Sequence, residues 1–234
     1  MSTRWAALAC DYDGTLANGG LVDDATLEAL GQVRRSGRKL LLVTGRELKD
    51  LFDVFPPITI FDRVVAENGA VLYDPASGRR RMLVHRPPRK LVRALQTRRV
   101  KPLSIGHAIV ATLRAQQRVV FKVIDELQLP LDVILNKRSL MVLPRGVNKA
   151  TGLQEALQEM GIAPADTVGI GDAENDADFL ALCGHSAAVA NALPKLKRKV
   201  HVVTSAGYGE GVAELVKQLL NGANTPQLLW KGRG

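Results

Sequence analysis

The sequence is poor in cysteine and in aromatic residues, and it lacks any long apolar run. Only two of its 234 residues are Cys, and 4% are aromatic. Both cysteines, Cys10 and Cys183, lie inside apolar segments, which favours buried thiols in a reducing compartment over a disulfide. No segment approaches the roughly 18 consecutive apolar residues of a membrane span, and the first residues do not form the apolar core of a signal peptide. We therefore expect a cytoplasmic protein without a membrane partner.

Acidic residues are missing from one long segment. Between Arg79 and Ile124 the chain has thirteen Lys and Arg and not one Asp or Glu, and the net charge of the whole chain is +9. The rest of the chain is therefore mildly acidic. Such a basic region fits an anionic substrate, an acidic partner or nucleic acid, and equally a solvated helix face.

Short apolar segments alternate with amphipathic ones along most of the chain, which is typical of a parallel α/β sheet. Strands are expected at 5–10, 39–43, 64–66, 167–170, 187–190 and 200–203, and a hairpin at 71–73 and 82–84. Helices are expected at 24–37, 47–55, 149–160, 175–182 and 211–220. This pattern predicts a Rossmann-like core of three layers with a mostly parallel sheet.

The segment from Pro87 to Arg145 interrupts the alternation. It is too long for a structureless loop in a compact domain, where loops beyond about 15 residues are uncommon. Helices are expected within it at 90–98 and 116–127, and strands at 105–113, 132–135 and 140–143. We therefore predict a core made of residues 1–86 and 146–222, a small α+β cap inserted at 87–145, and a tail or linker at 223–234.

Acidic and small polar residues follow three of the predicted core strands. Asp11 and Asp13 are two residues apart at the end of an extended segment, so their carboxylates are expected on one face. Thr44 follows the second strand. Asp172 follows a later one, with Asp176 four residues further on at a helix start. Because ligands of an open parallel sheet bind beyond the carboxyl ends of its strands, we expect these side chains in one crevice that suits Mg²⁺.

Calcium loops do not explain the acidic clusters. A loop that begins at Asp11 needs Glu at its twelfth position, where the chain has Val22. A loop that begins at Asp172 has Ala177 in place of the required Gly and Cys183 in place of the required Glu. Helix capping by Asp explains either cluster alone, but it does not explain their common position at strand ends.

The motifs and their order resemble those of the haloacid dehalogenase superfamily. The matching segments are Asp11 to Thr15, Val43 to Arg46, Lys149, and Gly171 to Asp176. The segments Ala66 to Ala70 and Ala190 to Ala192, together with the large insert, resemble the Cof-type branch. The chain length and the short cap are similar to those of archaeal-type phosphoglycolate phosphatases in that branch.

The resemblance implies an Mg²⁺-dependent phosphatase that hydrolyses a small phosphomonoester, either phosphoglycolate or a sugar phosphate. It implies that Asp11 attacks phosphorus to form an aspartyl-phosphate and that Asp13 serves as acid and base. The implied metal site consists of Asp11, the main-chain carbonyl of Asp13, Asp172 and Asp176. The implied phosphate-binding residues are Thr44, Gly45, Lys149 and Asn175, with Asn191 as a further supporting residue.

Two alternative functions stay open. One is a phosphosugar mutase or other phosphotransferase with the same nucleophile, and the other is a domain of a larger protein whose basic cap binds nucleic acid or an acidic partner. The cap is expected to select the substrate, and its candidate readers are His107, Arg114, Lys122, Asn136 and Arg138. The expected partner is a small anionic phosphorylated metabolite, and the sequence leaves the oligomeric state open.

Overall fold

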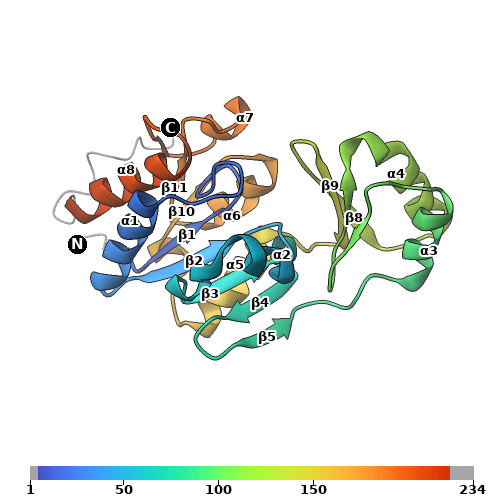
Figure 1. Cartoon of the computed structure of the whole chain (residues 1–234), viewed down its shortest axis with the longest axis horizontal. Helices are drawn as coiled ribbons and strands as arrows, with labels where there is room; N and C mark the ends of the chain where they lie inside the picture. Colours follow the sequence, from blue (N-terminus) through green and yellow to red (C-terminus); the bar gives the residue numbers. More distant parts are fainter. Residues whose placement is uncertain (1–4, 222–234) are drawn as a thin grey trace.

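The computed structural model describes residues 5–221, and most of its strands form one large sheet (Figure 1). The strands of this sheet are β1 (Ala7–Cys10), β2 (Lys39–Val43), β3 (Arg63–Ala66), β4 (Val71–Asp74), β5 (Arg79–Met82), β10 (Thr167–Gly171), β11 (His185–Ala188) and β12 (Val202–Val203). Their order is β12-β11-β10-β1-β2-β3-β4-β5. The pairs from β12 to β3 are parallel, whereas β4 is antiparallel to both of its neighbours. The predicted α/β class with a mostly parallel sheet is confirmed.

Helices cover both faces of the large sheet. They are α1 (Asp24–Arg35), α2 (Leu48–Val54), α5 (Lys149–Glu159), α6 (Ala177–Leu182), α7 (Pro194–Lys197) and α8 (Tyr208–Asn221). All residues of β1 are buried, and because successive side chains of a strand point to opposite faces, both faces must be covered. Helices α1 and α8 pack together, and so do α5 and α6. Within residues 5–221, no helix combines the length and apolar character that crossing a membrane requires.

Local capping chemistry sets the start of two helices that matter for the site. The carboxylate of Asp23, which precedes α1, accepts a hydrogen bond from the Thr26 amide at 2.6 Å. Asn148 precedes α5, and its side-chain oxygen accepts from the Thr151 amide at 3.0 Å. Such caps satisfy amides that the first helical turn leaves unpaired, so each helix begins where its sequence supplies the acceptor.

The cap segment, residues 87–145, forms a second sheet at one end of the molecule (Figure 1). Its elements are α3 (Arg89–Thr97), β6 (Ser104–Ile105), β7 (Val110–Leu113), α4 (Gln117–Glu126), β8 (Leu131–Asn136) and β9 (Ser139–Pro144), and the antiparallel strand order is β6-β7-β9-β8. Val110 and Leu140 pack in a cluster with α3 and α4, whereas Met141 and Leu143 belong to the core cluster. One face of the cap sheet therefore binds its own helices, and the other binds the core.

The chain passes between the core and the cap segment at two points that lie next to the same short segment. After β5, the Leu83 amide donates a hydrogen bond to the carbonyl oxygen of Ala70 at 2.9 Å. On the return, the main chain of Asn148 packs against Gly69 so closely that an added Cβ would overlap the Asn148 carbonyl. Gly69 also has a φ of +106°, so glycine is required here for both reasons.

The single strand predicted at 105–113 is wrong, because the structure divides this segment into β6 and β7. Between them, the Gly106 amide donates to the Ile109 carbonyl oxygen at 2.9 Å and closes a turn. The amides of residues 107–109 donate to the carboxylate of Glu67 in the core rather than to a neighbouring strand. A tertiary contact therefore overrides the local strand propensity.

The second strand of the predicted hairpin begins earlier than expected, since β5 begins at Arg79 and the prediction began at residue 82. The Asp74 carboxylate accepts a hydrogen bond from the Ala76 amide at 3.0 Å, and the Gly78 amide donates to the Asp74 carbonyl oxygen at 2.9 Å. These bonds close a short turn that pairs Asp74 directly with Arg79.

Other elements also differ from the prediction; α8, for example, begins at Tyr208 rather than at residue 211. Strand β11 begins at His185 rather than at residue 187, and the sequence pattern gave no sign of the short helix α7. Pro194 at the first position of α7 has a backbone angle suited to a helix start. The tail predicted at 223–234 lies outside the described residues.

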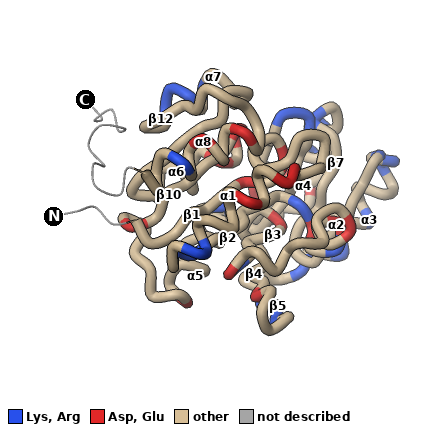
Figure 2. Tube along the Cα trace, turned by 60° about the vertical axis from the view of Figure 1, so that its left-hand side comes forward, with Lys and Arg blue, Asp and Glu red and all other residues tan. Residues whose placement is uncertain are grey.

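The acid-free segment from Arg79 to Ile124 covers β5, α3, β6, β7 and most of α4. Figure 2 shows Lys and Arg along β5 and α3. Some of this charge is neutralised within the chain, since Arg81 pairs with Glu155 and Arg98 pairs with Glu126. The basic region thus lies at one edge of the large sheet and on the cap segment.

Both cysteine thiols are expected to be inert in the folded protein. Cys10 is fully buried and Cys183 is 3% exposed. Burial raises the pKa of both thiols, to about 12 for Cys183, and the charge of Asp11 raises the pKa of Cys10 further. Since the thiolate is the reactive form, neither should react with DTNB at mildly alkaline pH until urea unfolds the chain. Thiol titration of native and unfolded protein checks this, and rapid reaction in the native state would contradict the buried positions.

Candidate active site

Three neighbouring strands of the large sheet end at one edge, and a buried polar residue follows each of them. Strand β1 lies between β10 and β2 and is parallel to both. Asp11 follows β1, Thr44 follows β2 and Asp172 follows β10. The carboxyl ends of such strands are where open parallel sheets bind ligands. The chain therefore brings polar groups from three distant segments to one place.

The loop after β1 brings the main chain close to Asp172. Gly14 has a φ of +92°, and an added Cβ would overlap the Asp172 carboxylate, so only glycine fits. The side-chain amide of Asn191 donates to the Gly14 carbonyl oxygen at 2.8 Å, and its oxygen accepts from the Tyr208 amide at 2.7 Å. Asn191 thus ties this loop to the start of α8.

Asp11, Asp172 and Asp176 form a buried carboxylate cluster. One oxygen of each lies within 4.8 Å of the others. Asp176 ends the short 3-10 helix η5 (Glu174–Asp176), and its Oδ2 accepts hydrogen bonds from the amides of Asp172 at 2.8 Å and Ala173 at 2.9 Å. A set of carboxylate oxygens without nitrogen or sulfur suits a hard divalent cation.

Two ammonium groups lie against this cluster. Lys149, the first residue of α5, is fully buried, and its Nζ lies 2.5 Å from Asp11 Oδ1 and 2.7 Å from Asp176 Oδ1. Lys137, at the tip of the β8–β9 hairpin, forms an ion pair with Asp172. Three carboxylates against two ammonium groups leave an excess of negative charge, which would attract a divalent cation.

Burial and charge act on the pKa values of these groups in opposite directions. Burial lowers the pKa of Lys149, but the charges of Asp11 and Asp176 outweigh it, so the pKa lies above its ordinary value. Burial and the charge of Asp176 raise the pKa of Asp11, against the lowering effect of Lys149. Burial and Asp176 also raise the pKa of Asp172, which Lys137 lowers. The carboxylates therefore repel one another, and positive charge between them relieves the repulsion.

Asp13 has a different partner from Asp11. Strand β1 ends at Cys10, so the alternation that predicted both carboxylates on one face does not extend to Asp13. Arg46 donates two hydrogen bonds to the Asp13 carboxylate, of 2.7 and 2.8 Å, and a third to Asp50 at 2.6 Å. Asp11 and Asp13 nevertheless line the same cavity.

The residues predicted to bind phosphate differ in whether their polar atoms already have hydrogen-bond partners. The hydroxyl oxygen of buried Thr44 accepts a hydrogen bond from the Arg46 amide at 3.1 Å. Gly45 lines the cavity. The side-chain nitrogen of Asn175 donates to Asn68 at 3.0 Å, while its buried oxygen has no hydrogen-bond partner among residues 5–221.

A cavity of about 550 Å³ opens between the core and the cap segment. Its core side consists of Asp11, Asp13, Gly45, Arg46, Glu47, Lys49, Asp50 and Asp53, and its cap side of Ser104, Ile109, Ala111, Asn136, Ser139 and Met141. The core side is thus mostly acidic. The cap side contains no charged residue, and its polar groups are hydroxyls and one amide.

Asn136 is the member of the five predicted cap readers that lines this cavity. The other four have partners or positions elsewhere: His107 contacts Glu67, Arg114 pairs with Glu174, Lys122 pairs with Glu126, and Arg138 is exposed. The difference follows from topology. Asn136 ends the strand that turns toward the core, whereas Lys122 lies on α4, on the outer side of the cap sheet.

Two residues of the site were not predicted. Arg46 belongs to a motif quoted for the resemblance but was given no role. Lys137 reads as an ordinary lysine in the turn between two predicted strands. Its amide donates to Glu174 at 3.1 Å and its φ is +51°. No local signal in the sequence indicates that this turn reaches the core.

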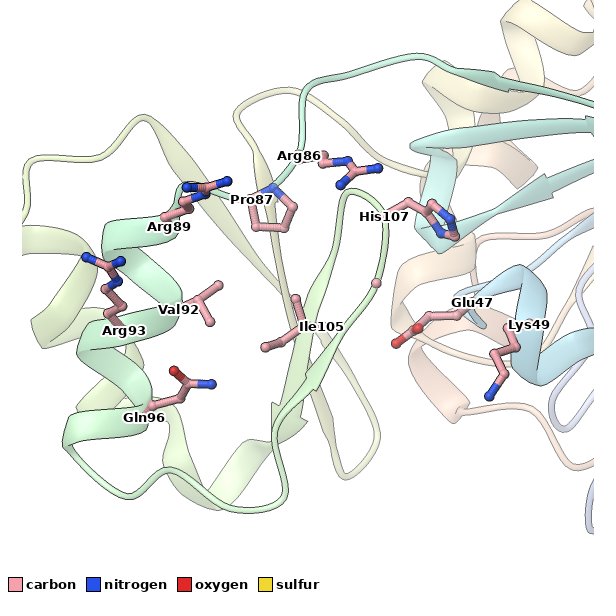
Figure 3. Close-up of a pocket in the computed structure, with 11 residues that line it drawn as sticks. Glu47, Lys49, Arg86, Pro87, Arg89, Val92, Arg93, Gln96, Ile105 and His107 are labelled. Atoms are coloured by element: carbon pink, nitrogen blue, oxygen red, sulfur yellow. The ribbon is translucent and has the colours of Figure 1, made fainter.

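A second cavity, of about 700 Å³, adjoins the first, and Glu47 and Lys49 line both. Figure 3 shows it between helix α3 and the turn that carries His107. Arg86 lines it from the segment that leads into α3, and Arg89 and Arg93 line it from α3 itself. Its cap side is therefore basic, in contrast to the uncharged cap side of the first cavity.

Comparisons with known proteins agree with the motifs. A family model described as haloacid dehalogenase-like hydrolase matches residues 8–95 and 111–216. The chain is 30% identical to the phosphoglycolate phosphatase of Methanothermobacter thermautotrophicus over 92% of this chain and 98% of the relative. It is 29% identical to that of Aeropyrum pernix over 96% and 97%. Its fold is similar to that of a haloacid dehalogenase-like hydrolase from Bacteroides thetaiotaomicron, with a TM-score of 0.77, 19% identity and coverage of 92% and 100%. The resemblance stated from the motifs is confirmed.

Replacement of Lys149 by Met is expected to destabilise the metal-free protein strongly. The change leaves Asp11 and Asp176 buried without their shared cation, and loss of one partner from a buried ion pair costs about 3 kcal/mol or more. Urea unfolding at neutral pH in EDTA measures the free energy of unfolding. Lys199→Met, at an exposed position, is the matched control and should change it by less than about 0.5 kcal/mol. Equal effects of the two substitutions would show that the buried ion pairs are not stabilising.

Proposed function

The chain belongs to the haloacid dehalogenase-like hydrolases, and we propose that it is an Mg²⁺-dependent phosphatase that hydrolyses a small phosphomonoester through an aspartyl-phosphate. The observation that carries this proposal is the buried cluster of Asp11, Asp172 and Asp176, with Lys149 against it, at the carboxyl ends of the central strands. The two phosphoglycolate phosphatases that match nearly the whole chain support the choice of a phosphatase.

The residues at the cluster fit Mg²⁺. Their ligand atoms are all carboxylate oxygens, and the three carboxylates outnumber the two ammonium groups that lie against them. Asp11, Asp172 and the main-chain carbonyl of Asp13 would hold the ion, and Asp176 would orient these ligands. When bound, the ion neutralises charge on the phosphoryl oxygens.

Asp11 is the nucleophile in this proposal. A carboxylate oxygen of Asp11 bonds to phosphorus as the bond from phosphorus to the leaving oxygen breaks, and Asp13 donates a proton to that oxygen. In the second step Asp13 takes a proton from water. The water oxygen bonds to phosphorus as the bond to Asp11 breaks. The products are an alcohol and inorganic phosphate, and both carboxyl groups return to their initial states.

Arg46 has to release Asp13 for the first proton transfer. Both oxygens of the Asp13 carboxylate accept hydrogen bonds from the guanidinium, so in this arrangement neither oxygen is free to reach the leaving group. Arg46 lines the cavity, so the negative charge of a bound phosphate attracts the guanidinium away from Asp13. Substrate binding thereby prepares Asp13 to act as the acid.

The other site residues bind and orient the phosphoryl group. Lys149 neutralises charge on Asp11 and on the phosphate. The Thr44 hydroxyl and the Gly45 amide donate hydrogen bonds to phosphoryl oxygens, and Asn175 supports the loop that carries the metal ligands. The proposed division into a core (1–86 and 146–222) and a cap (87–145) lets the cap close over the cavity and exclude water.

The cavity favours a neutral, hydroxylated leaving group. Ser104, Asn136 and Ser139 on the cap side offer hydrogen bonds but no positive charge. On the core side, the two basic residues Arg46 and Lys49 are outnumbered by acidic ones, so the lining has an excess of negative charge even when Arg46 leaves Asp13. A second anionic group on the substrate would meet repulsion here. Sugar phosphates therefore fit this cavity better than phosphoglycolate does.

Asp11→Asn tests the nucleophile. It is expected to reduce Mg²⁺-dependent release of p-nitrophenol from p-nitrophenyl phosphate by at least about 10³-fold, because an amide oxygen is a poor nucleophile. Asp125→Asn, at an exposed position on α4, is the matched control and should retain full activity. EDTA should abolish the activity of the unaltered protein, and Mg²⁺ should restore it. Full activity of the Asn variant would rule out Asp11 as the nucleophile.

Substrate preference tests the character of the cavity. We expect kcat/KM to be at least about tenfold higher for a neutral sugar phosphate than for phosphoglycolate, because like charges close together in a partly desolvated cavity repel. Asp53→Asn removes one of these charges and should reduce the preference, while Asp125→Asn should leave it unchanged. Phosphate release measured over a panel of both substrate classes checks this preference. Better turnover of phosphoglycolate than of every sugar phosphate would contradict the assignment.

A further inference from the structure

We propose that Glu67 is a positioning residue that holds the cap segment against the proposed phosphate-binding loop (residues 44–46). Closure of the cap and binding of phosphate are thereby coupled. The segment from Glu67 to Gly69 has no part in the chemistry described above. It lies within the segment whose sequence resembles the Cof-type branch of the family. The coupling rests on the proposed function, whereas the contact itself does not.

The carboxylate of Glu67 belongs to the core, but all its hydrogen-bond donors belong to the cap segment. Oε1 accepts from the His107 amide at 3.0 Å and from His107 Nδ1 at 3.1 Å. Oε2 accepts from the Ala108 amide at 2.7 Å and the Ile109 amide at 3.1 Å. Consecutive amides of one turn thus surround a fully buried carboxylate, an arrangement typical of anion-binding turns.

The His107 ring has a defined role in this contact. Its Nε2 lies 2.8 Å from a nitrogen of Arg80, and because a guanidinium can only donate, Nε2 must be the acceptor. Nδ1 therefore carries the hydrogen and donates it to Glu67. Within residues 5–221, no Lys or Arg side chain forms an ion pair with the Glu67 carboxylate. Arg80 on β5, His107 on the cap segment and Glu67 therefore form one chain of hydrogen bonds.

The main chain of the same segment holds the phosphate-binding loop. The Glu67 amide donates to the Arg46 carbonyl oxygen at 2.9 Å, and the Asn68 amide donates to the Thr44 carbonyl oxygen at 3.0 Å. The side-chain oxygen of Asn68 accepts from Asn175, which precedes Asp176 of the carboxylate cluster. Glu67 and Asn68 therefore contact three segments: the turn of the cap at residues 106–109, the phosphate-binding loop at residues 44–46, and the loop at residues 172–176.

Backbone strain also marks this segment. Glu67 and Asn68 have φ values of +49° and +56°, and both are fully buried. A left-handed conformation is unfavourable for a non-glycine residue, so surrounding contacts must hold it in place. Such strain is common at functional sites. A buried glutamate is also less favourable for packing alone than an apolar side chain, because burial removes its carboxyl group from water.

The turn held by Glu67 forms a wall between the two cavities. Ile109 lines the active-site cavity, whereas Gly106 and His107 line the second one, and Figure 3 shows this turn facing the core. Loss of the Glu67 contact would let the turn move away from the bound substrate. Gly106 fits closely, since an added Cβ would lie 2.8 Å from Glu67 Oε2 and 2.7 Å from the Ile109 side chain.

Glu67→Gln removes the charge and directs an amide NH₂ group toward donors, with little change in volume. We expect amide hydrogen exchange at residues 107–109 to become at least about tenfold faster, with exchange in β1 and β2 unchanged. Glu126→Gln is the matched control, because it removes an exposed glutamate that pairs with Arg98 in the cap segment. It should leave exchange at 107–109 as it is.

A second readout separates positioning from general stability. In the unaltered protein, Mg²⁺ with inorganic phosphate should slow exchange at 107–109, and in Glu67→Gln this slowing should be lost. For p-nitrophenyl phosphate, we expect KM to rise by about tenfold while kcat changes by less than about threefold. Binding of Mg²⁺ alone, measured by calorimetry, should be the same in both proteins, since the metal ligands are intact.

Gly106→Ala tests the same contact from the cap side and replaces Glu67→Gln if that variant does not fold. It should speed exchange at 107–109 to a similar extent, and the double variant should be no worse than either single variant because both remove one contact. Unchanged exchange in both variants overturns the contact whatever the enzyme does. Faster exchange with an unchanged phosphate effect and KM overturns the coupling, while absence of any phosphatase activity refutes only the proposed function.

Discussion

The ion pairs of one buried lysine hold the site together. Lys149 brings its charge to Asp11, which follows β1, and to Asp176, which follows β10, so it joins the two strands that carry the chemistry. Its position at the start of α5 is unfavourable in the field of the helix dipole, and its burial removes it from water. These costs are offset only when both carboxylates are present. The geometry of Asp11, Asp176 and the start of α5 is therefore specified as a unit.

Close packing of glycines lets the loops converge around that lysine. Gly14 brings the loop after β1 onto the Asp172 carboxylate, and Gly69 brings the segment after β3 onto the main chain that precedes Lys149. Neither position accepts a Cβ, and both have positive φ. The strand order does the rest, because β10, β1 and β2 are neighbours and end at the same edge. Sheet topology sets the approximate position of each group, and the glycines permit the final approach.

Much of this arrangement could be predicted from local sequence, and the remainder depends on contacts between distant segments. Strand ends at Asp11, Thr44 and Asp172 follow from apolar runs that stop at polar residues, so the crevice and its acidic character were predictable. The partners of Lys137 and Glu67 were not, because each contact joins the core to the cap segment, and no periodicity records how two sheets face each other. For the same reason the turn at residues 106–109 was predicted as part of a strand.

The two chain crossings that flank residues 69 and 70 have a consequence for how such proteins diversify. Leu83 leaves the core beside Ala70, and Asn148 returns beside Gly69, so the insert begins and ends at nearly the same point in space. An insert attached in this way does not change the spacing of the core strands. The insert can therefore change in length without a change in the strand order of the large sheet, so the residues over the cavity can vary while the strand ends stay in place.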